Sequence, residues 1–455
     1  MSNNDTICAL ATAPGGALGI IRVSGPKAFS IVSSLCSVCC ADSAANTVHY
    51  THITDGSDII DEAMVAVFRA PHSYTGEDSV EISCHGSRYI LNKVLELLVK
   101  NGCRMANPGE YTQRAYLNGK MDLSQAEAVA DLIASTNKAT HHLAMSQLRG
   151  GISSELAQLR EKLLKLTSLL ELELDFSDHE DLEFADRKEL TELTKTIDKH
   201  ITRLAKSFET GQAIRQGIPV AIVGKTNVGK STLLNRLLHE DRAIVSDIHG
   251  TTRDTIEDVM EIHGVQFRFI DTAGIRQTTD EIERIGIQRT YAAMEKARII
   301  LWLIDSKPAE EELQEILYHL HDKSLIIIQN KIDKKETIDL SKVLTGIIPQ
   351  NVFIKISAKT GEGIDVLEQA IYESAQLPTI SDSDVIITNA RHYDALLRAH
   401  SSIQRVLDGM AQQLSGDLLS DDLHQTIDIL AEITGGQITP HEVLGNIFKN
   451  FCVGK

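Results

Sequence analysis

The stretch GKTNVGKS, Gly224–Ser231, decides the fold of this chain. It fits the pattern G-x-x-x-x-G-K-[ST], follows the short apolar run VAIVG, and precedes STLLNRLL, which has the apolar spacing of a helix. A loop of this kind turns backbone N–H groups inward around phosphates. Lys230 then reaches the β and γ oxygens, and the Ser231 hydroxyl suits Mg²⁺. The sequence therefore predicts a phosphate-binding loop between a strand and a helix.

Two motifs after this loop offer groups for a metal ion and a terminal phosphate. DTAG, Asp271–Gly274, lies at the end of the next expected strand, where a carboxylate can hold Mg²⁺ through water and a glycine N–H can sense the γ-phosphate. GTTRD, Gly250–Asp254, precedes DTAG and offers Thr252 as a second hydroxyl ligand. We therefore expect Mg²⁺ at Ser231 and Thr252.

Two further motifs predict a guanine pocket. NKID, Asn330–Asp333, follows the strand-like run LIIIQ, and its carboxylate can accept both the N1–H and the 2-amino N–H of guanine. Adenine does not present this pair of donors. SAK, Ser357–Lys359, ends the last expected strand and would complete the pocket with backbone N–H groups. The motifs follow one another in the order expected of a GTP site, so we predict selectivity for GTP over ATP.

The group that activates the attacking water is less clear from the motifs. Ile275 follows the DTAG glycine, so the glutamine that orients water in Ras-type GTPases is absent. The next stretch offers Gln277, Glu281 and Glu283 as candidates. Asn227 places an amide oxygen inside the phosphate loop, where a monovalent cation could supply the positive charge that an arginine usually brings.

The rest of the chain indicates further domains. Buried β-type runs alternate with helical stretches from VAIVG to about Leu377, which predicts a doubly wound parallel α/β domain.

From Thr6 to about Asn118, strand-like runs (ALGIIRVSG, AMVAVFRA, SVEISCHG) and one helical stretch predict a small α+β domain. Leucines at alternating steps of three and four predict a long amphipathic helix: Leu156, Leu159, Leu163, Leu166 and Leu170. The chain is helical again from Asn389, and the two helical segments are expected to pack together.

Composition limits the partners and the compartment. The 455 residues carry a formal net charge of −18, which opposes sequence-blind phosphate binding, so a nucleic-acid role needs a local basic patch or a partner subunit. The longest apolar run, Ile299–Ile304, is far shorter than the about 20 residues of a membrane span. Seven cysteines without an export signal are typical of reduced thiols. We expect a cytoplasmic protein with no membrane role.

Several stretches resemble the MnmE family of tRNA modification GTPases, also called TrmE, over essentially the whole chain. They are DTICALATAPGGALGIIRVSG, YTGEDSVEISCHG, PGEYTQRAYLNGKMDLSQAEAVADLI, GTTRD, DTAGIR, DEIERIGIQR, EITGG and the terminal FCVGK. The resemblance implies an N-terminal α+β domain that binds tetrahydrofolate and dimerises (1–118). A discontinuous all-α helical domain follows (119–216 and 379–455), with an inserted Ras-like α/β P-loop GTPase domain (217–378).

The resemblance also implies the site residues. GTP would bind Asn227, Val228, Gly229, Lys230, Ser231, Thr232, Ser246, Asp247, Ile248, His249, Gly250, Thr251, Thr252, Asp271, Thr272, Ala273, Gly274, Asn330, Lys331, Asp333, Ser357, Ala358 and Lys359. K⁺ would bind at Asn227, Ser246, Ile248 and Thr251, and promote pairing of GTPase domains and hydrolysis. The catalytic residues would be Glu283, which positions the water, Lys230, and Cys452 near the folate. The folate contacts would be Arg22, Glu81, Lys120 and Lys455.

The cofactors implied for this chain are GTP, Mg²⁺, K⁺ and a one-carbon tetrahydrofolate, in the 5-formyl or methylene form. The implied partners are a second copy of the chain, tRNA, and the FAD-containing MnmG (GidA) protein in a heterotetramer. Together they would build a carboxymethylaminomethyl or aminomethyl group on the wobble uridine. One alternative is a ribosome-assembly or signalling GTPase switch, although an RNA-binding module such as a KH domain is not evident. Another makes the N-terminal segment only a dimerisation scaffold.

Overall fold

The computed structural model describes residues 5–175, 187–240, 258–270, 292–320, 323–334, 352–377 and 385–436, with the separate residues 444, 447–449, 451 and 454. The chain divides into two compact units. The first comprises Met1–Ala134, Ala144–Arg203 and Arg391–Lys455, and the second comprises Ser135–Leu143 and Leu204–Ala390. Residues on both sides of the second unit in sequence therefore belong to the first.

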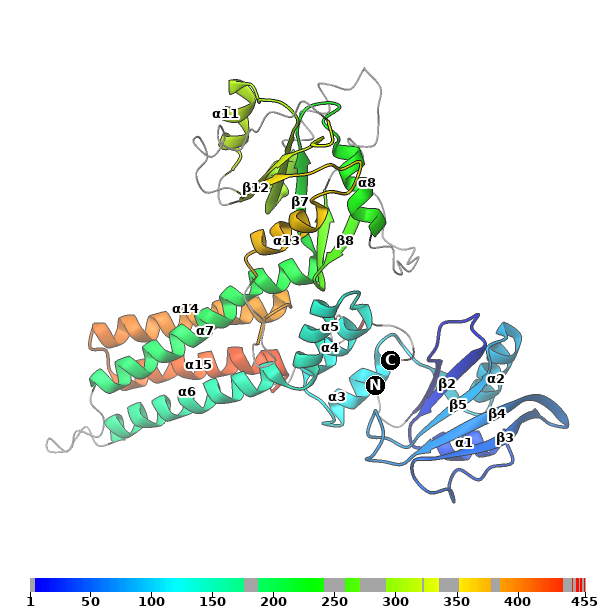
Figure 1. Cartoon of the computed structure of the whole chain (residues 1–455). Helices are drawn as coiled ribbons and strands as arrows, with labels where there is room; N and C mark the ends of the chain where they lie inside the picture. The colour runs from blue at the N-terminus through cyan, green and yellow to red at the C-terminus, as the bar shows by residue number, and fades with distance from the viewer. Residues whose placement is uncertain are drawn as a thin grey trace. The chain divides into compact units, whose positions relative to one another are not determined.

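The first unit begins with a mixed sheet in the order β3-β4-β5-β2-β1-β6 (Figure 1). All neighbouring strands are antiparallel except β1 and β6, which run parallel. The strands are β1 (Thr6–Leu10), β2 (Leu18–Ser24), β3 (Thr47–Asp55), β4 (Asp58–Phe68), β5 (Ser79–His85) and β6 (Cys103–Met105). The three strand-like runs predicted from the sequence are β2, β4 and β5. The other strands of this sheet are not among the predicted runs.

One face of this sheet carries two helices, α1 (Ala28–Ser33) and α2 (Arg88–Lys100). Apolar side chains recur on one side of α2 and are buried against the sheet: Leu91, Val94, Leu97 and Leu98. This spacing of three and four residues is the reason that the segment folds as an amphipathic helix. The helix ends at Lys100, with Asn101 as its C-cap directly before Gly102, as the sequence predicts.

The rest of the first unit is a helical layer. Its described helices are α3 (Glu110–Leu117), α4 (Leu123–Ala134), α6 (Gly151–Asp175), α14 (Ala390–Ala411), α15 (Gly416–Thr434) and the first part of α7 (Arg187–Gln216). The helix α5 (Lys138–Leu148) crosses from the second unit into the first. The predicted leucine stripe is confirmed, because all five leucines are buried on α6. α6 and α15 pack side by side along their length (Figure 1).

A buried group of charges joins three of these helices. The Glu127 carboxylate on α4 accepts hydrogen bonds from Arg391 Nε and Nη2, at 3.0 and 2.9 Å, and lies 2.8 Å from His392 Nε2. Arg391 also donates to the carbonyl oxygens of Glu432 and Ile433, at the end of α15. Burial acts to raise the pKa of Glu127, but His392 and Arg391 together hold this pKa below its usual value. Glu127 is therefore a buried carboxylate kept ionised by its partners.

The second unit contains a six-stranded sheet in the order β12-β11-β10-β7-β9-β8. Its strands are β7 (Ile218–Val223), β8 (Asp258–Ile262), β9 (Val265–Phe269), β10 (Ile299–Ile304), β11 (Ser324–Gln329) and β12 (Val352–Lys355). The described helices of this sheet are α8 (Lys230–Glu240), α11 (Glu310–Tyr318) and α13 (Ile364–Ser374). β7, the strand before the phosphate loop, lies inside the sheet between β10 and β9.

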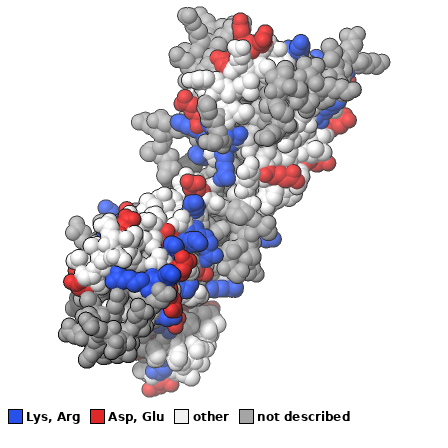
Figure 2. All heavy atoms as spheres, turned by 90° about the vertical axis from the view of Figure 1, so that its left-hand side faces the viewer, with Lys and Arg blue, Asp and Glu red and all other residues white. Residues whose placement is uncertain are grey.

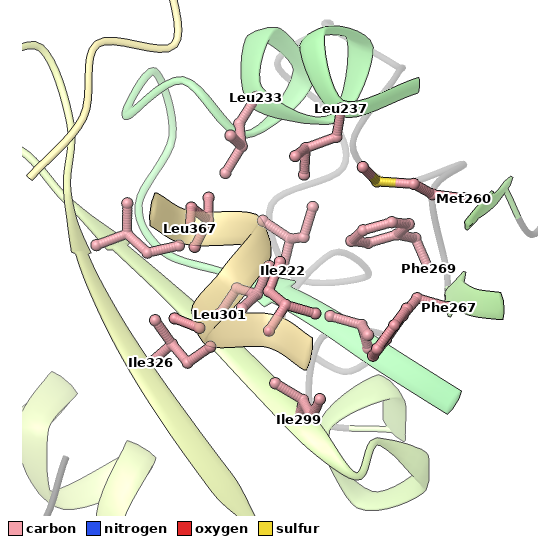
Figure 3. Close-up of a cluster of buried hydrophobic side chains, with 14 of the residues drawn as sticks. Ile222, Leu233, Leu237, Met260, Phe267, Phe269, Ile299, Leu301, Ile326 and Leu367 are labelled. Carbon is pink, nitrogen blue, oxygen red and sulfur yellow. The ribbon is translucent and has the colours of Figure 1, made fainter. Parts of the chain in front are cut away.

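Both faces of this sheet are buried. Ile222 of β7 lies in one apolar cluster with Leu233 and Leu237 of α8 and Leu367 of α13 (Figure 3). Val220 of β7 belongs to the same cluster. The alternate residues of β7 lie in a second cluster, together with a residue of α11: Ala221, Val223 and Ile316. Since side chains of a strand alternate between faces, helices must cover both sides. The prediction of a doubly wound sheet is confirmed for this part of the chain.

The sheet is mixed, however, and not wholly parallel as the alternation of strands and helices predicts. β8 pairs antiparallel with β9 through a tight turn at His263 and Gly264. Both turn residues have positive φ, 51° and 83°, as a hairpin turn of type I′ requires. A histidine tolerates this left-handed conformation less well than asparagine, so the pair His-Gly is a weak sequence signal. The expectation of a wholly parallel sheet is therefore wrong, because β8, which is not among the predicted runs, is antiparallel, while the other five strands are parallel.

Among the helices that the structure describes, none is both long enough and apolar enough to cross a bilayer.

Candidate nucleotide-binding site

The predicted phosphate loop lies between β7 and α8, where the sequence places it. Asn227 has a φ of 64° and Gly229 a φ of 107°. A Cβ at Gly229 would lie 2.3 Å from the Asn330 Nδ2 atom, so the loop closes tightly at that point. Left-handed residues of this kind let successive N–H groups turn toward one side. The loop therefore has the backbone geometry for phosphate binding.

The loop lysine folds back onto the loop. Lys230 Nζ donates to the carbonyl oxygens of Gly224 and Lys225, at 2.5 and 2.8 Å. Burial lowers the pKa of Lys230, and the negative charge of Glu312 partly offsets this. A phosphate would replace the two carbonyls as the partner of the ammonium group. Ser231, the expected Mg²⁺ ligand, is half-buried at the start of α8, and Thr232 beside it is exposed.

Asn330 brings the base-side motifs to the loop. Its Nδ2 donates to the Val228 carbonyl at 2.8 Å, and its Oδ1 accepts the Ala358 N–H at 3.0 Å. Asn330 and Ala358 are both buried, at 2% exposure each. One side chain therefore ties the phosphate loop to both the NKID and the SAK segments.

Lys331 connects the NKID segment to the phosphate loop and to the end of β10. Its Nζ donates to the Asn227 carbonyl at 2.7 Å and to Asp305 Oδ2 at 2.6 Å. The hydrogen bond from Lys331 is the main cause that lowers the pKa of Asp305. Asp305, at the end of β10, was not among the predicted site residues. Its signal was its place directly after a buried strand of the same sheet.

Asp333, the residue predicted to read the base, is held by the SAK segment. Its carboxylate is exposed, and Oδ1 accepts the Ser357 hydroxyl at 2.8 Å. This hydrogen bond is the main cause that lowers the pKa of Asp333, so the group is ionised. The carbonyl oxygen of Lys359, the last SAK residue, accepts a hydrogen bond from Arg236 Nη2 at 2.7 Å. An ionised carboxylate at this edge of the sheet can accept the two N–H donors of guanine.

The remaining predicted GTP and cation residues lie outside the described residues. These are Ser246, Asp247, Ile248, His249, Gly250, Thr251, Thr252, Asp271, Thr272, Ala273 and Gly274, with the candidates for water activation Gln277, Glu281 and Glu283. Cys452 and Lys455 also lie outside them. Within the described residues, no three His, Cys, Asp or Glu side chains gather as a metal cluster.

A second group of predicted residues lies on the N-terminal sheet. Arg22 on β2 and Glu81 on β5 are directly opposite each other, with Arg22 Nη2 2.7 Å from Glu81 Oε1. The Arg22 guanidinium lies over the rings of Tyr74 and Tyr111, at 5.5 and 5.6 Å. Arg22 also donates to the Gly454 carbonyl at 3.2 Å, so the end of the chain reaches this pair. The two tyrosines were not predicted.

Lys120 lies on the loop beside this pair. Its Nζ donates to the Pro71 carbonyl at 2.9 Å, and its stem lies against Gly76. Lys120 thus contacts the loop 71–76, and this second loop carries Tyr74, which contacts Arg22. The structure thus brings Arg22 and Glu81 together and places Lys120 on the neighbouring loop, without a contact to Arg22 among the described interactions.

A network of charges centred on the buried Arg114 and Glu110 lies beside the loop 71–76 and reaches it at Glu77. Arg114 binds Asp5, Glu77 and Glu110, with side-chain N···O distances of 2.6 to 3.2 Å. Arg104 binds Asp5 and Glu110 as well. Burial acts to raise the pKa of Glu110, but bonds from Arg104, the Asn107 N–H and Arg114 together lower it. This network is a second feature that the sequence patterns did not reveal.

The loop geometry and the base-side contacts define a phosphate-loop protein with a guanine-type base pocket. The chain matches two family models, that of the GTP-binding protein TrmE N-terminus over residues 6–120 and that of the MnmE helical domain over residues 123–452. The chain belongs to the MnmE (TrmE) family. The prediction of this family is confirmed, and the two matched domains disfavour an assembly or signalling switch of another family.

Curated relatives agree with this assignment over their full length. The chain is 53% identical to a protein of Phocaeicola vulgatus and 54% identical to one of Bacteroides thetaiotaomicron, with 100% of each chain covered. Both relatives are named tRNA modification GTPase MnmE. Among solved structures, the G domain of the T. maritima FeoB iron transporter is 27% identical over 35% of this chain and 99% of its own, with a TM-score of 0.26.

Proposed function

We propose that this chain binds and hydrolyses GTP in the modification of tRNA, as the name of its relatives states for them. The observation that carries the proposal is the Asn330 side chain, which joins Val228 of the phosphate loop to Ala358 of the SAK segment. This arrangement supports the assignment of Asp333 and Lys230 to the two ends of one bound nucleotide. The family membership supports the same activity.

Each group of predicted site residues would have its own role in nucleotide binding. The loop N–H groups and Lys230 would neutralise the phosphates, and Asp333 would select guanine. Mg²⁺ would be held by Ser231 and Thr252 and would balance the charge of the β and γ phosphates. Lys331, between the Asn227 carbonyl and Asp305, would keep the base-side loop against the phosphate loop.

Hydrolysis needs a water-positioning group and a positive charge near the transferred phosphate. We assign the first role to Glu283 and the second to K⁺ at Asn227, Ser246, Ile248 and Thr251, completed when two GTPase domains pair. The exposed position and left-handed backbone of Asn227 support a cation at this edge of the loop. Turnover in K⁺ should exceed turnover in Na⁺ at equal ionic strength, and equal rates would remove K⁺ from the proposal.

We assign the N-terminal group to a one-carbon tetrahydrofolate. Arg22 and Lys120 are cations that can pair with the glutamate tail, and Glu81 can accept N–H donors of a pterin-like ring. Tyr74 and Tyr111 offer ring faces beside Arg22. Lys455 and Cys452 belong to the chain end whose Gly454 carbonyl contacts Arg22. Cys452 is the proposed thiol near the folate.

The chemistry on tRNA is proposed to need partners. A chain with a net charge of −18 is a poor match for a polyanion, and the Lys and Arg side chains on the face in Figure 2 occur in short groups with Asp and Glu between them. A homodimer and the flavoprotein MnmG, which would carry the FAD, would supply the missing surface. The six cysteines that the structure describes are free thiols, which fits a reducing compartment such as the cytoplasm.

The experiment that tests the proposed function is mass spectrometry of wobble nucleosides from cells that lack this protein. We expect the carboxymethylaminomethyl or aminomethyl uridine to disappear and to return with the wild-type chain, but not with an Asp333→Asn chain. A normal nucleoside profile in the deletion strain would refute the role in tRNA modification. Purified chain that prefers ATP would refute the GTP site.

A further inference from the structure

Glu312, on α11, connects the phosphate loop to the core of the sheet. Its Oε1 accepts the indole N–H of Trp302 on β10 at 3.3 Å. Its Oε2 lies 3.2 Å from the ammonium of Lys225, the second residue of GKTNVGKS. Trp302 is fully buried, the Glu312 side chain is 20% exposed and the Lys225 side chain is 54% exposed. One carboxylate therefore accepts a hydrogen bond from the buried indole and forms an ion pair, without hydrogen-bond geometry at Oε2, with a mostly exposed loop side chain.

The residue that Glu312 holds also contacts the loop lysine. The Lys225 carbonyl accepts a hydrogen bond from Lys230 Nζ at 2.8 Å. Glu312 is close enough for its charge to raise the pKa of Lys230 against the effect of burial. Side chain and backbone of Lys225 are thus both engaged, the first by Glu312 and the second by the lysine that would bind phosphate.

We propose that Glu312 is a positioning residue for the nucleotide site, which holds the first turn of the phosphate loop through Lys225 and links it to Trp302. The inference rests on the proposed GTP site and deepens it. Glu312 belongs to none of the motifs by which the site is recognised in the sequence. Glu312 would act on a bound nucleotide through Lys225.

The direction in which nucleotide affinity changes when Glu312 is replaced separates a positioning role from a pure charge effect and from a role only in folding. By charge alone, loss of a carboxylate near the phosphates would strengthen nucleotide binding. A role only in folding would lower the melting temperature and leave the affinity of the folded protein unchanged. A positioning role predicts weaker binding, because a loop that samples more conformations must be ordered by the nucleotide.

The experiment compares Glu312→Gln with Glu311→Gln in the full-length chain, using GDP as the probe. Both variants remove one negative charge from α11, but Glu311 is exposed. We expect Glu312→Gln to weaken GDP binding about fivefold and to leave kcat at saturating GTP within about twofold of the wild type. Glu311→Gln should change neither value. Unchanged or tighter GDP binding by Glu312→Gln would overturn the proposal.

A double-mutant cycle tests the route through Lys225. Lys225→Gln should weaken GDP binding, and the double variant with Glu312→Gln should bind no more weakly than Lys225→Gln alone. Additive losses would show that the two side chains act independently and would reject this route. If the wild-type chain itself fails to bind GDP, the proposed GTP site is wrong, whereas normal wild-type binding with additive losses rejects only the role of Glu312.

Trp302 gives a second readout, since it is the single tryptophan of the chain. GDP should change the emission of the wild-type and Glu311→Gln proteins. The change should be reduced in Glu312→Gln at saturating GDP, because the indole is then disconnected from Lys225. An equal response in Glu312→Gln would also contradict the proposal, and melting temperatures of all variants check that each is folded.

Discussion

The Asn330 side-chain amide donates to the Val228 carbonyl oxygen across 2.8 Å, so the NKID motif is bonded directly to the phosphate loop. The same side chain accepts the Ala358 N–H. Both bonds are buried, and a buried polar group that loses its partner is costly. The guanine-side segments and the phosphate-side loop are therefore one connected structure in this chain.

Asn330→Ala should weaken GDP binding by at least about tenfold and destabilise the protein by about 1–3 kcal/mol, because it leaves the Val228 carbonyl and the Ala358 N–H without this partner. The measurements are calorimetric titration with GDP and thermal unfolding. Asn235→Ala, at an exposed position of α8, is the matched control and should behave as the wild type. An Asn330→Ala protein with normal GDP affinity would contradict the bridging role.

Asp333→Asn should change the preferred base from guanine to xanthine. The carboxylate accepts two N–H donors, whereas an amide offers one acceptor and one donor, which matches the N1–H and the 2-oxo group of xanthine. We expect the affinity for GTP to fall by about 100-fold and the affinity for XTP to exceed it. Competition binding with GTP, XTP and ATP checks this. Retained preference for GTP would show that Asp333 does not read the base.

Glu283→Ala should slow hydrolysis by at least about 100-fold at saturating GTP while GTP affinity stays within about twofold of the wild type. The reason is that a water-positioning carboxylate acts on the attacking group and not on the bound nucleotide. Glu281→Ala and Gln277→Ala are the controls for the two other candidates. Single-turnover kinetics separate binding from chemistry, and a normal rate in Glu283→Ala transfers the role to one of these residues.

Arg22→Met should weaken binding of 5-formyltetrahydrofolate by at least about tenfold, because it removes the charge that pairs with an anionic group beside Glu81. Lys27→Met is the control, since Lys27 is an exposed cation just after the same strand. Titration calorimetry of both full-length variants measures the effect. If the wild-type chain gives no binding heat with 5-formyltetrahydrofolate, the N-terminal domain is a scaffold only, and the assignment of a folate to the group around Arg22 is wrong.

Glu127→Gln should reduce the melting temperature most at neutral pH. The folded pKa of Glu127 lies below the usual 4.5, so its stabilising contribution is present above that value and is lost as the pH falls through the folded pKa. The difference in melting temperature between the wild type and the variant should therefore shrink toward zero as the pH falls below about 4.5. Glu161→Gln, exposed on α6, is the control. A difference that grows at low pH would contradict the sign of this pKa shift.

The fold could be predicted where one residue pattern had one structural solution. The continuous apolar runs in VAIVG and LIIIQ give buried parallel strands, and the five leucines of α6 give a buried stripe. The antiparallel β8 was missed because its turn, His263-Gly264, lacks the usual asparagine or aspartate at the first position. Short strands such as β6 carry too few residues to show a period.

The candidate site could be predicted only as far as its motifs reach. Asn330, Asp333 and Lys230 belong to patterns whose spacing reflects a shared ligand. Glu312, Asp305 and Tyr74 belong to no such pattern, because they come to the sites through the packing of distant segments. Asp305 had only the weak signal of following a buried strand, and the contacts of all three residues depend on the packing of segments apart in sequence.

The tight approach of Asn330 to Gly229 has a consequence for genetics. An alanine at 229 would meet two separate penalties, a Cβ only 2.3 Å from the Asn330 amide and a φ of 107° that other residues rarely adopt. A smaller residue at 330 could relieve the first penalty but not the second, and it would break the contact to Val228. A selection for suppressors of Gly229→Ala should therefore return revertants to glycine and no compensating change at 330.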